Sequence, residues 1–134
     1  MSVHNVTLTG GAGYLPMFYF QSPDSLVMQH ITITNSNVQS LVLAERCADL
    51  NVNNITIDNN LVAQTTLGLI TCSGFLSDVT VTNCIGSTSS NNVIANVASN
   101  VTFANLQCSH NSFISGGAVS CYGSSIAIYS SDIM

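Results

Sequence analysis

The chain has 134 residues, enough for one domain with a substantial core, and carries one basic residue against six acidic ones, for a formal net charge of −5. So little positive charge argues against a protein that binds nucleic acid phosphates or an anionic membrane surface. A hydrophobic content of 46% argues against disorder. The sequence contains no run of about 18 apolar residues, so no membrane-spanning helix is predicted.

One short strand motif recurs along the whole chain, as HNVTLTGG, QHITITNS, NNITIDNN, DVTVTNCIGS, SNVTFANL and SSIAIYSS. The first apolar residues of the six copies are Val6, Ile31, Ile55, Val79, Val101 and Ile126. They follow one another at a nearly constant interval of about 24 residues, and a period between about 20 and 50 residues is the signature of a solenoid.

Each period reads as a β-branched strand, a polar turn and a second apolar run, such as MFYF, LVLA or LGLI. We therefore expect an all-β, single-domain, right-handed parallel β-helix of about six coils with a period of about 24 residues. Residues 1–134 would form one such domain, as a segment of a longer solenoid. Because neither end carries an obvious cap, head-to-tail self-association or continuation into flanking coils is also expected.

The fourth residue after each first apolar position is polar or glycine: Gly10, Asn35, Asn59, Asn83, Asn105 and Ser130. Stacked coils would bring these side chains together, so the sequence predicts an amide ladder with a structural role.

Threonine dominates the outward positions of the repeated strand. The candidate ligand face consists of Thr7, Thr9, Thr32, Thr34, Thr56, Thr80, Thr82 and Thr102. Its uncharged hydroxyl groups suit hydrogen bonding to a glycan or to another protein. The T-x-T spacing also resembles ice-binding β-solenoids, although Asp58, Ala104 and Tyr129 interrupt the array.

A further outward column is predicted to hold Asn5, His30, Asn54, Asp78, Asn100 and Ser125. Three of its members, Asn5, Asn54 and Asn100, open an N-x-T sequon and are candidate glycosylation sites in a secreted protein.

Four cysteines lie about one period apart in two pairs, Cys47 with Cys72 and Cys84 with Cys108. Each pair is predicted to occupy one column of adjacent coils, where either a disulfide or two buried thiols would fit. Cys121 has no counterpart at one period.

The sequence contains few residues that could serve in catalysis. Arg46, the single basic residue, directly follows Glu45, and a solvated charge pair accounts for both. Asp58 and Asp78 are predicted to lie about 14 Å apart, too far for a pair of hydrolytic carboxylates. Asp24 and Asp49 are separated by about one period and are the least unlikely catalytic pair.

No metal or cofactor site is predicted. The three histidines, His4, His30 and His110, show no metal-ligand spacing, and the sequence contains no phosphate-binding loop or nucleophile motif.

Residues 105–133, NLQCSHNSFISGGAVSCYGSSIAIYSSDI, resemble the repeat of polymorphic outer membrane proteins and similar surface repeat proteins of protists. The resemblance rests on Gly116, Gly117, Ala118, Val119, Ser125, Ile126, Ile128 and Ser131. The six copies together resemble the broader pectin-lyase-like β-helix superfamily.

These resemblances imply a non-catalytic structural or adhesive module at the cell surface or outside the cell, with a glycan or protein surface as partner. No signal peptide is visible in MSVHNVTLTG. A polysaccharide lyase or glycoside hydrolase fragment of the superfamily is the alternative, and an ice-binding solenoid the third possibility.

Overall fold

The computed structural model describes residues 1–87, 92–113, 118–129 and 131–133, which form strands and turns only. Sheet A contains β1 (Ser2–Thr9), β3 (Ser25–Thr34), β5 (Asp49–Asp58), β7 (Ser73–Thr82), β10 (Asn100–Ser109), β12 (Ser125–Tyr129) and β13 (Asp132–Ile133). Sheet B contains β2 (Phe18–Gln21), β4 (Asn37–Glu45), β6 (Leu61–Ile70), β8 (Ile85–Gly86), β9 (Asn92–Val97) and β11 (Val119–Tyr122). The described part of the chain is therefore all-β, as expected.

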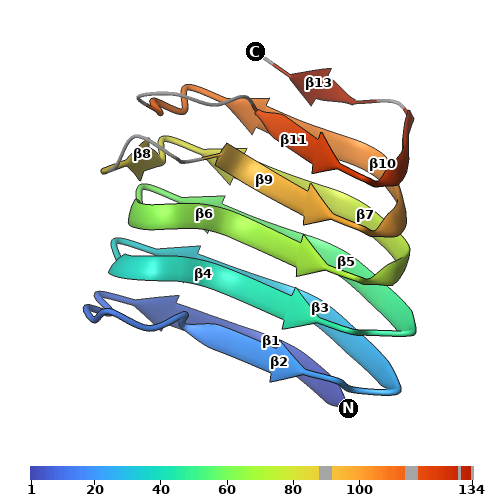
Figure 1. The fold of residues 1–134 in the computed structure, drawn as a ribbon. Coiled ribbons are helices and arrows are strands. Elements are labelled where there is room, and N and C mark those ends of the chain that lie inside the picture. Colours follow the sequence, from blue (N-terminus) through green and yellow to red (C-terminus); the bar gives the residue numbers. More distant parts are fainter. Residues whose placement is uncertain (88–91, 114–117, 130, 134) are drawn as a thin grey trace.

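The chain alternates between the two sheets and climbs steadily from the N-terminal to the C-terminal coil (Figure 1). Each strand pairs in parallel with the strand one coil away, in the order β1-β3-β5-β7-β10-β12 in sheet A and β2-β4-β6-β9-β11 in sheet B. The predicted right-handed parallel β-helix is confirmed. Six successive strands in sheet A correspond to five full turns.

Every long strand of sheet A bends once in its middle. The bend residues share a left-handed backbone: Asn5, His30, Asn54, Asp78 and Asn105, with φ between 51° and 55°. Each bend inserts one extra residue into the alternation of inward and outward side chains, so the strand consists of two arms. In β5, for example, Leu50 and Val52 point inward from the first arm, and Ile55 and Ile57 from the second.

The register of β10 corrects the sequence prediction. Val79 pairs with Leu106 on the second arm, whereas Val101 pairs with Gly74 on the first arm. The predicted alignment of Val101 with Val79 is therefore wrong, and Val101 and Ile126, which do pair, both belong to the first arm. The error arose because both arms carry an alternating β-branched pattern. Only the left-handed Asn105 marks where β10 bends.

Two corners join the sheets, and each begins with a left-handed residue. At the first corner, from sheet A to sheet B, these residues are Gly10, Asn35, Asn59, Asn83 and His110. At the second corner, from sheet B to sheet A, they are Ser22, Arg46, Thr71, Ala98 and Gly123. Asn105 is thus a bend residue and not part of the predicted corner ladder, and Ser130 lies outside the described residues.

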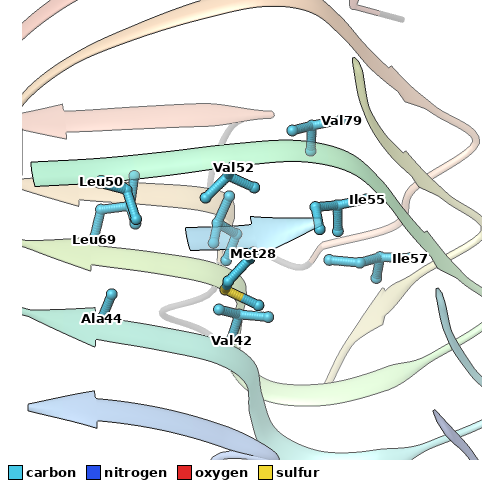
Figure 2. Close-up of a pocket in the computed structure, with 10 residues that line it drawn as sticks. Met28, Val42, Ala44, Leu50, Val52, Ile55, Ile57, Leu69 and Val79 are labelled. Atoms are coloured by element: carbon cyan, nitrogen blue, oxygen red, sulfur yellow. The ribbon is translucent and has the colours of Figure 1, made fainter. Parts of the chain in front are cut away.

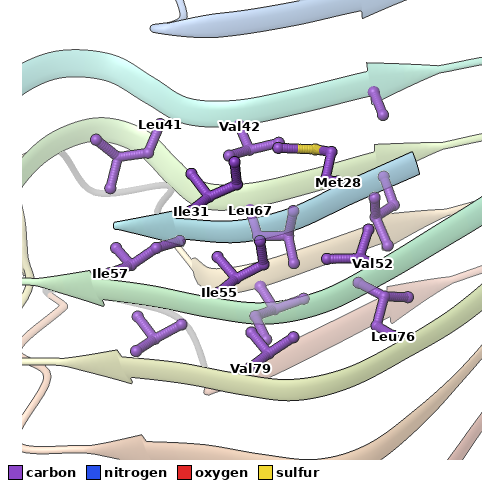
Figure 3. Packing of buried hydrophobic residues seen from close by; sticks show 14 of the residues in the cluster. Met28, Ile31, Leu41, Val42, Val52, Ile55, Ile57, Leu67, Leu76 and Val79 are labelled. Atoms are coloured by element: carbon purple, nitrogen blue, oxygen red, sulfur yellow. The ribbon is translucent and has the colours of Figure 1, made fainter. Parts of the chain in front are cut away.

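Aliphatic side chains from both sheets fill the space between them (Figure 3). Ile31, Ile55 and Val79 stack one above another in successive coils, and Val42 and Leu67 approach them from sheet B. An apolar cavity of only about 10 Å³ remains, between residues such as Met28, Val52 and Leu69 (Figure 2). Because that is about the space of one water probe, this cavity cannot hold a ligand. The binding surfaces considered below are therefore on the outside.

Candidate binding surfaces

The second arms of sheet A carry seven of the eight predicted threonines on one outward face. One column runs Thr7, Thr32, Thr56 and Thr80, and the next runs Thr9, Thr34, Asp58 and Thr82. We call these eight residues the threonine face. Thr7 and Thr9 are exposed and the others are half-buried. Parallel register thus brings together hydroxyl groups that lie a full coil apart in the sequence.

Thr102 does not belong to this face. It pairs with Phe75 on one side and Ala127 on the other, on the first arm of the sheet. In β10 the two threonine columns continue with Gln107 and Ser109 instead. The prediction placed Thr102 with the others only because it assumed the wrong register for Val101.

Hydrogen bonds connect neighbouring coils within the threonine face. The Thr34 hydroxyl donates to the Thr9 hydroxyl at 3.3 Å, and the Thr82 hydroxyl donates to Asp58 Oδ1 at 2.7 Å. Asn83 Nδ2 donates to the same carboxylate oxygen at 2.7 Å. The hydrogen bonds from Asn83 and Thr82 lower the pKa of Asp58, so its negative charge persists at neutral pH. The face is hydroxyl-rich with one fixed charge.

The amide ladder of the first corner is confirmed in part. Asn59 Nδ2 donates to Asn35 Oδ1 at 2.6 Å, as expected for stacked asparagines, whereas Asn83 turns to Asp58. Asn60, which the repeat pattern did not indicate, points its side chain inward and is 2% exposed. Asn60 Oδ1 accepts from the Ser36 amide at 2.9 Å, and Asn60 Nδ2 donates to the Ile33 and Asp58 carbonyls at 3.0 and 2.9 Å.

The bend residues of sheet A form a second polar row. The predicted outward column is confirmed for its first four members, but in β10 the row continues with Asn105 instead of Asn100, which pairs with Ser125 on the first arm. Asn54 Nδ2 lies 2.9 Å from His30 Nδ1, and Asn105 Nδ2 donates to Asp78 Oδ1 at 2.7 Å. Two of the three sequon asparagines, Asn5 and Asn54, are exposed bend residues. The third, Asn100, is exposed at the start of β10 beside Ser73, so it does not share their column.

All five cysteines are free thiols, and four of them are buried. Cys47 and Cys72 occupy the second corner of adjacent coils, as predicted, and the Ser73 amide donates to the Cys47 carbonyl at 2.9 Å. The predicted column of Cys84 and Cys108 is wrong. Cys84 follows the first corner, where its amide donates to Asn111 Oδ1, and Cys108 pairs with Val81 inside the sheet.

Burial determines the ionisation of these thiols. Desolvation, followed by the nearby Cys84, raises the pKa of Cys108 to about 11, and desolvation also raises the pKa values of Cys47, Cys72 and Cys84. The four buried cysteines are therefore protonated core side chains at neutral pH.

The least unlikely catalytic pair is not stacked. Asp49 pairs with Ser25, whose hydroxyl donates to Asp49 Oδ2 at 3.3 Å, and Asp24 lies one position before that pair. The prediction took the interval from Asp24 to Asp49 as one coil, but the coil is one residue shorter here. Asp78 and Asp58 lie in different polar rows, at the bend and on the second arm.

Within the described ranges, no three His, Cys, Asp or Glu side chains are grouped to hold a metal ion. In the same part of the chain, no helix has the length and apolar character needed to cross a membrane.

The outward face of sheet B contains a hollow of about 370 Å³ that the sequence analysis did not identify. We call it the sheet B hollow. Its apolar lining is formed by Leu43, Gly68, Ile70, Ala95 and Val97, and its polar lining by Glu45, Gln64 and Thr65. Leu43, Gly68 and Ala95 pair across three coils; the Leu43 side chain extends over Gly68, and the small Ala95 leaves space beyond it. The glycine in LGLI, Gly68, was the only feature of the sequence that could have indicated this hollow.

A tyrosine and a carboxylate lie at one end of the sheet B hollow. Tyr19, which is 48% exposed, pairs with Leu43 and donates its phenol hydrogen to Glu45 Oε2 at 2.8 Å. This hydrogen bond to Glu45 raises the pKa of Tyr19, with smaller contributions from desolvation and from the charge of Glu45. The hydroxyl therefore remains a hydrogen-bond donor at neutral pH.

Comparison of the chain with models of protein families, with characterised proteins and with solved structures finds no significant match.

Proposed function

We propose that the protein is a non-catalytic, extracellular or cell-surface β-helix module that binds neutral glycans through the threonine face. The observation that carries the proposal is the parallel register of seven threonines across four coils. A surface of hydroxyl groups held on a rigid sheet can donate and accept hydrogen bonds without requiring a charged ligand. The resemblances to polymorphic outer membrane proteins and to the pectin-lyase-like superfamily motivate the proposed location.

The carboxylates of the second arm and the bend support a binding function over catalysis. Asp58 accepts hydrogen bonds from Thr82 and Asn83, and Asp78 accepts from Asn105 and Asn53. Each of these acids thus links adjacent coils. A general acid for glycoside hydrolysis would instead need a raised pKa, whereas that of Asp58 is lowered.

The proposal is tested by binding of the chain to an array of neutral oligosaccharides. Replacing Thr32 and Thr80 together by valine keeps the side-chain shape but removes two hydroxyls of one column, and we expect binding to weaken at least about tenfold. Thr102→Val is the matched control, because it makes the same chemical change on the first arm. Equal losses in both variants, or no retained oligosaccharide, would contradict the proposal.

Ice binding is a second candidate, favoured by one observation. The pairs Thr7/Thr9, Thr32/Thr34 and Thr80/Thr82 share two columns, interrupted by Asp58. Replacing Asp58 by threonine would complete the array. If ice is the ligand, this variant should increase the thermal hysteresis of the solution, and a glycan-binding protein should show none in either form.

A further inference from the structure

The sheet B hollow lies on the sheet opposite the threonine face and has a different chemistry. We propose that it is a separate binding site for the ring of a neutral sugar. Its volume of about 370 Å³ lies within the range of about 300 to 1,000 Å³ typical of small-molecule sites. This site goes beyond the proposed function, because none of its lining residues belongs to the threonine face.

The hollow owes its shape to two features of β6. Gly68 has no side chain, so the Leu43 side chain can lie across it; a Cβ placed at Gly68 would lie only 2.8 Å from Leu43 Cδ1. The pairing of β4 with β6 also shifts between Val38 and Ser40, so that β6 contains one additional residue beside Gln64. The exposed Gln64 belongs to the hollow's lining, and the small side chain of Ala95 lies beside Gly68, on the side away from Leu43.

The lining combines an apolar surface with a few polar groups. Leu43, Ile70 and Val97 offer a surface for the C–H groups of a pyranose ring. Glu45 and Gln64 supply a hydrogen-bond acceptor and an amide for ring hydroxyls, whereas the Thr65 hydroxyl is already bonded to the Leu67 and Val93 carbonyls. Tyr19 adds an exposed aromatic ring next to Leu43. A ligand with an apolar face and hydroxyl edges satisfies both kinds of lining.

Other occupants fit this lining less well. An extended peptide would need a free sheet edge, but β4, β6 and β9 each pair with a strand on both sides. An anionic sugar or a phosphate would meet the carboxylate of Glu45 in a chain of net charge −5. A purely hydrocarbon ligand would remove water from Gln64 and from the charged Glu45 carboxylate, for which the bond from Tyr19 compensates only in part.

The site is tested by titrating the ¹⁵N-labelled chain with methyl glycosides of glucose, galactose, mannose and N-acetylglucosamine. We expect amide shifts at Gly68 and Ala95 with at least one of these sugars. Ala95→Leu fills the hollow and should weaken that binding at least about tenfold. Glu45→Gln keeps the shape but replaces the charged acceptor, and should weaken binding between about threefold and tenfold.

The Thr32→Val, Thr80→Val variant is the control that separates the two proposed sites. It should leave binding in the sheet B hollow unchanged, even if the threonine face proves to bind nothing. Well-dispersed spectra of each variant establish that it is folded. The proposal is overturned if no glycoside shifts Gly68 or Ala95, if Ala95→Leu binds as well as the parent chain, or if only an apolar dye occupies the hollow.

Discussion

The two corners of each coil adopt the same left-handed backbone with different residues. At the first corner three of the five left-handed positions are asparagine: Asn35, Asn59 and Asn83. At the second corner the corresponding residues are Ser22, Arg46, Thr71, Ala98 and Gly123. Asparagine tolerates this backbone because its side chain can hydrogen-bond locally, whereas a β-branched residue such as Thr71 does not favour it. The coil geometry therefore requires the left-handed backbone at both corners, and the residue type determines only how much this backbone destabilises the fold.

The residue after each left-handed position also differs between the corners. At the first corner Asn60 points inward and bonds three backbone groups from two coils. The first corner also has small inward residues, Ser36 and Cys84, but at the second corner none of the inward residues is an asparagine. There Ser99 links the coils by accepting from the Cys72 amide at 3.0 Å and donating to the Leu69 carbonyl at 3.1 Å. Among the described residues, side-chain amides, from Asn60 and Asn111, thus bond the backbone of the first corner only, whereas buried thiols and hydroxyls occur at both corners.

The largest effect is expected for Asn60→Ala. This change leaves the Ser36 amide and the Ile33 and Asp58 carbonyls without the partner they have in the native structure. At about 1 to 3 kcal/mol for each buried group, the free energy of unfolding should fall by about 3 kcal/mol or more. Urea denaturation measures this loss. A loss below about 1 kcal/mol would mean that water replaces the amide and that the first corner is not held by it.

A smaller loss is expected for Asn59→Thr, which gives the first corner the residue found at Thr71. The left-handed backbone at φ 53° would then carry a β-branched side chain, and the bond from Asn59 to Asn35 would be lost. We expect a destabilisation of about 1 to 2 kcal/mol by urea denaturation. Gln64→Thr is an exposed control in β6, outside the left-handed positions.

The reciprocal change, Thr71→Asn, should stabilise the protein. Thr71 has φ 55° and its amide donates to the Val97 carbonyl at 2.8 Å, a bond that asparagine retains. Relief of the backbone cost should raise the free energy of unfolding by about 1 kcal/mol. An unchanged or lower stability would show that the second corner is not strained, and that the contrast with the first corner is one of sequence only.

The smallest effect at neutral pH is expected for the thiols, because Cys47 and Cys72 of the second corner, Cys84 of the first corner and Cys108 of β10 are all buried. A thiol reagent should modify the exposed Cys121 quickly and the other four only after unfolding. Above pH 9 the free energy of unfolding should begin to decrease because of Cys108. The Cys108 pKa of about 11 exceeds the ordinary value of 9.0, so the unfolded chain loses this proton first and stability falls as the pH rises from about 9 to about 11.

A Cys108→Val variant provides the control for this pH dependence. It should lose part of the decline in stability above pH 9 while keeping its stability near neutral pH. Rapid modification of four or more thiols in the native protein would contradict the buried positions of these side chains.

The same contrast explains how much could be predicted from the sequence. The stacking of Val6, Ile31, Ile55 and Val79 and the first corner at Asn35 and Asn59 follow from repeated residue types, and both are confirmed. The second corner could not be predicted, because no residue type marks its left-handed positions.

The register of the fifth coil failed for a related reason. Both arms show a similar alternation of apolar and polar residues, so Val101 could be aligned with either arm. Only the pairing of Leu106 with Val79 shows that the coil between β7 and β10 is longer than the others. The sheet B hollow was missed because it depends on the outward direction of Gly68 and Ala95 and on the irregular pairing of β6, which become visible only when strands are paired.

Pairing between adjacent coils also has a mechanical consequence. Each strand of sheet A bonds to strands one coil away in the sequence, so force applied to the two ends of the chain reaches the coils one after another. Removal of one coil would release about 80 Å of extended chain while leaving the next coil paired. Stretching should therefore lengthen the molecule in regular steps, and the protein would yield to tension gradually instead of rupturing at once.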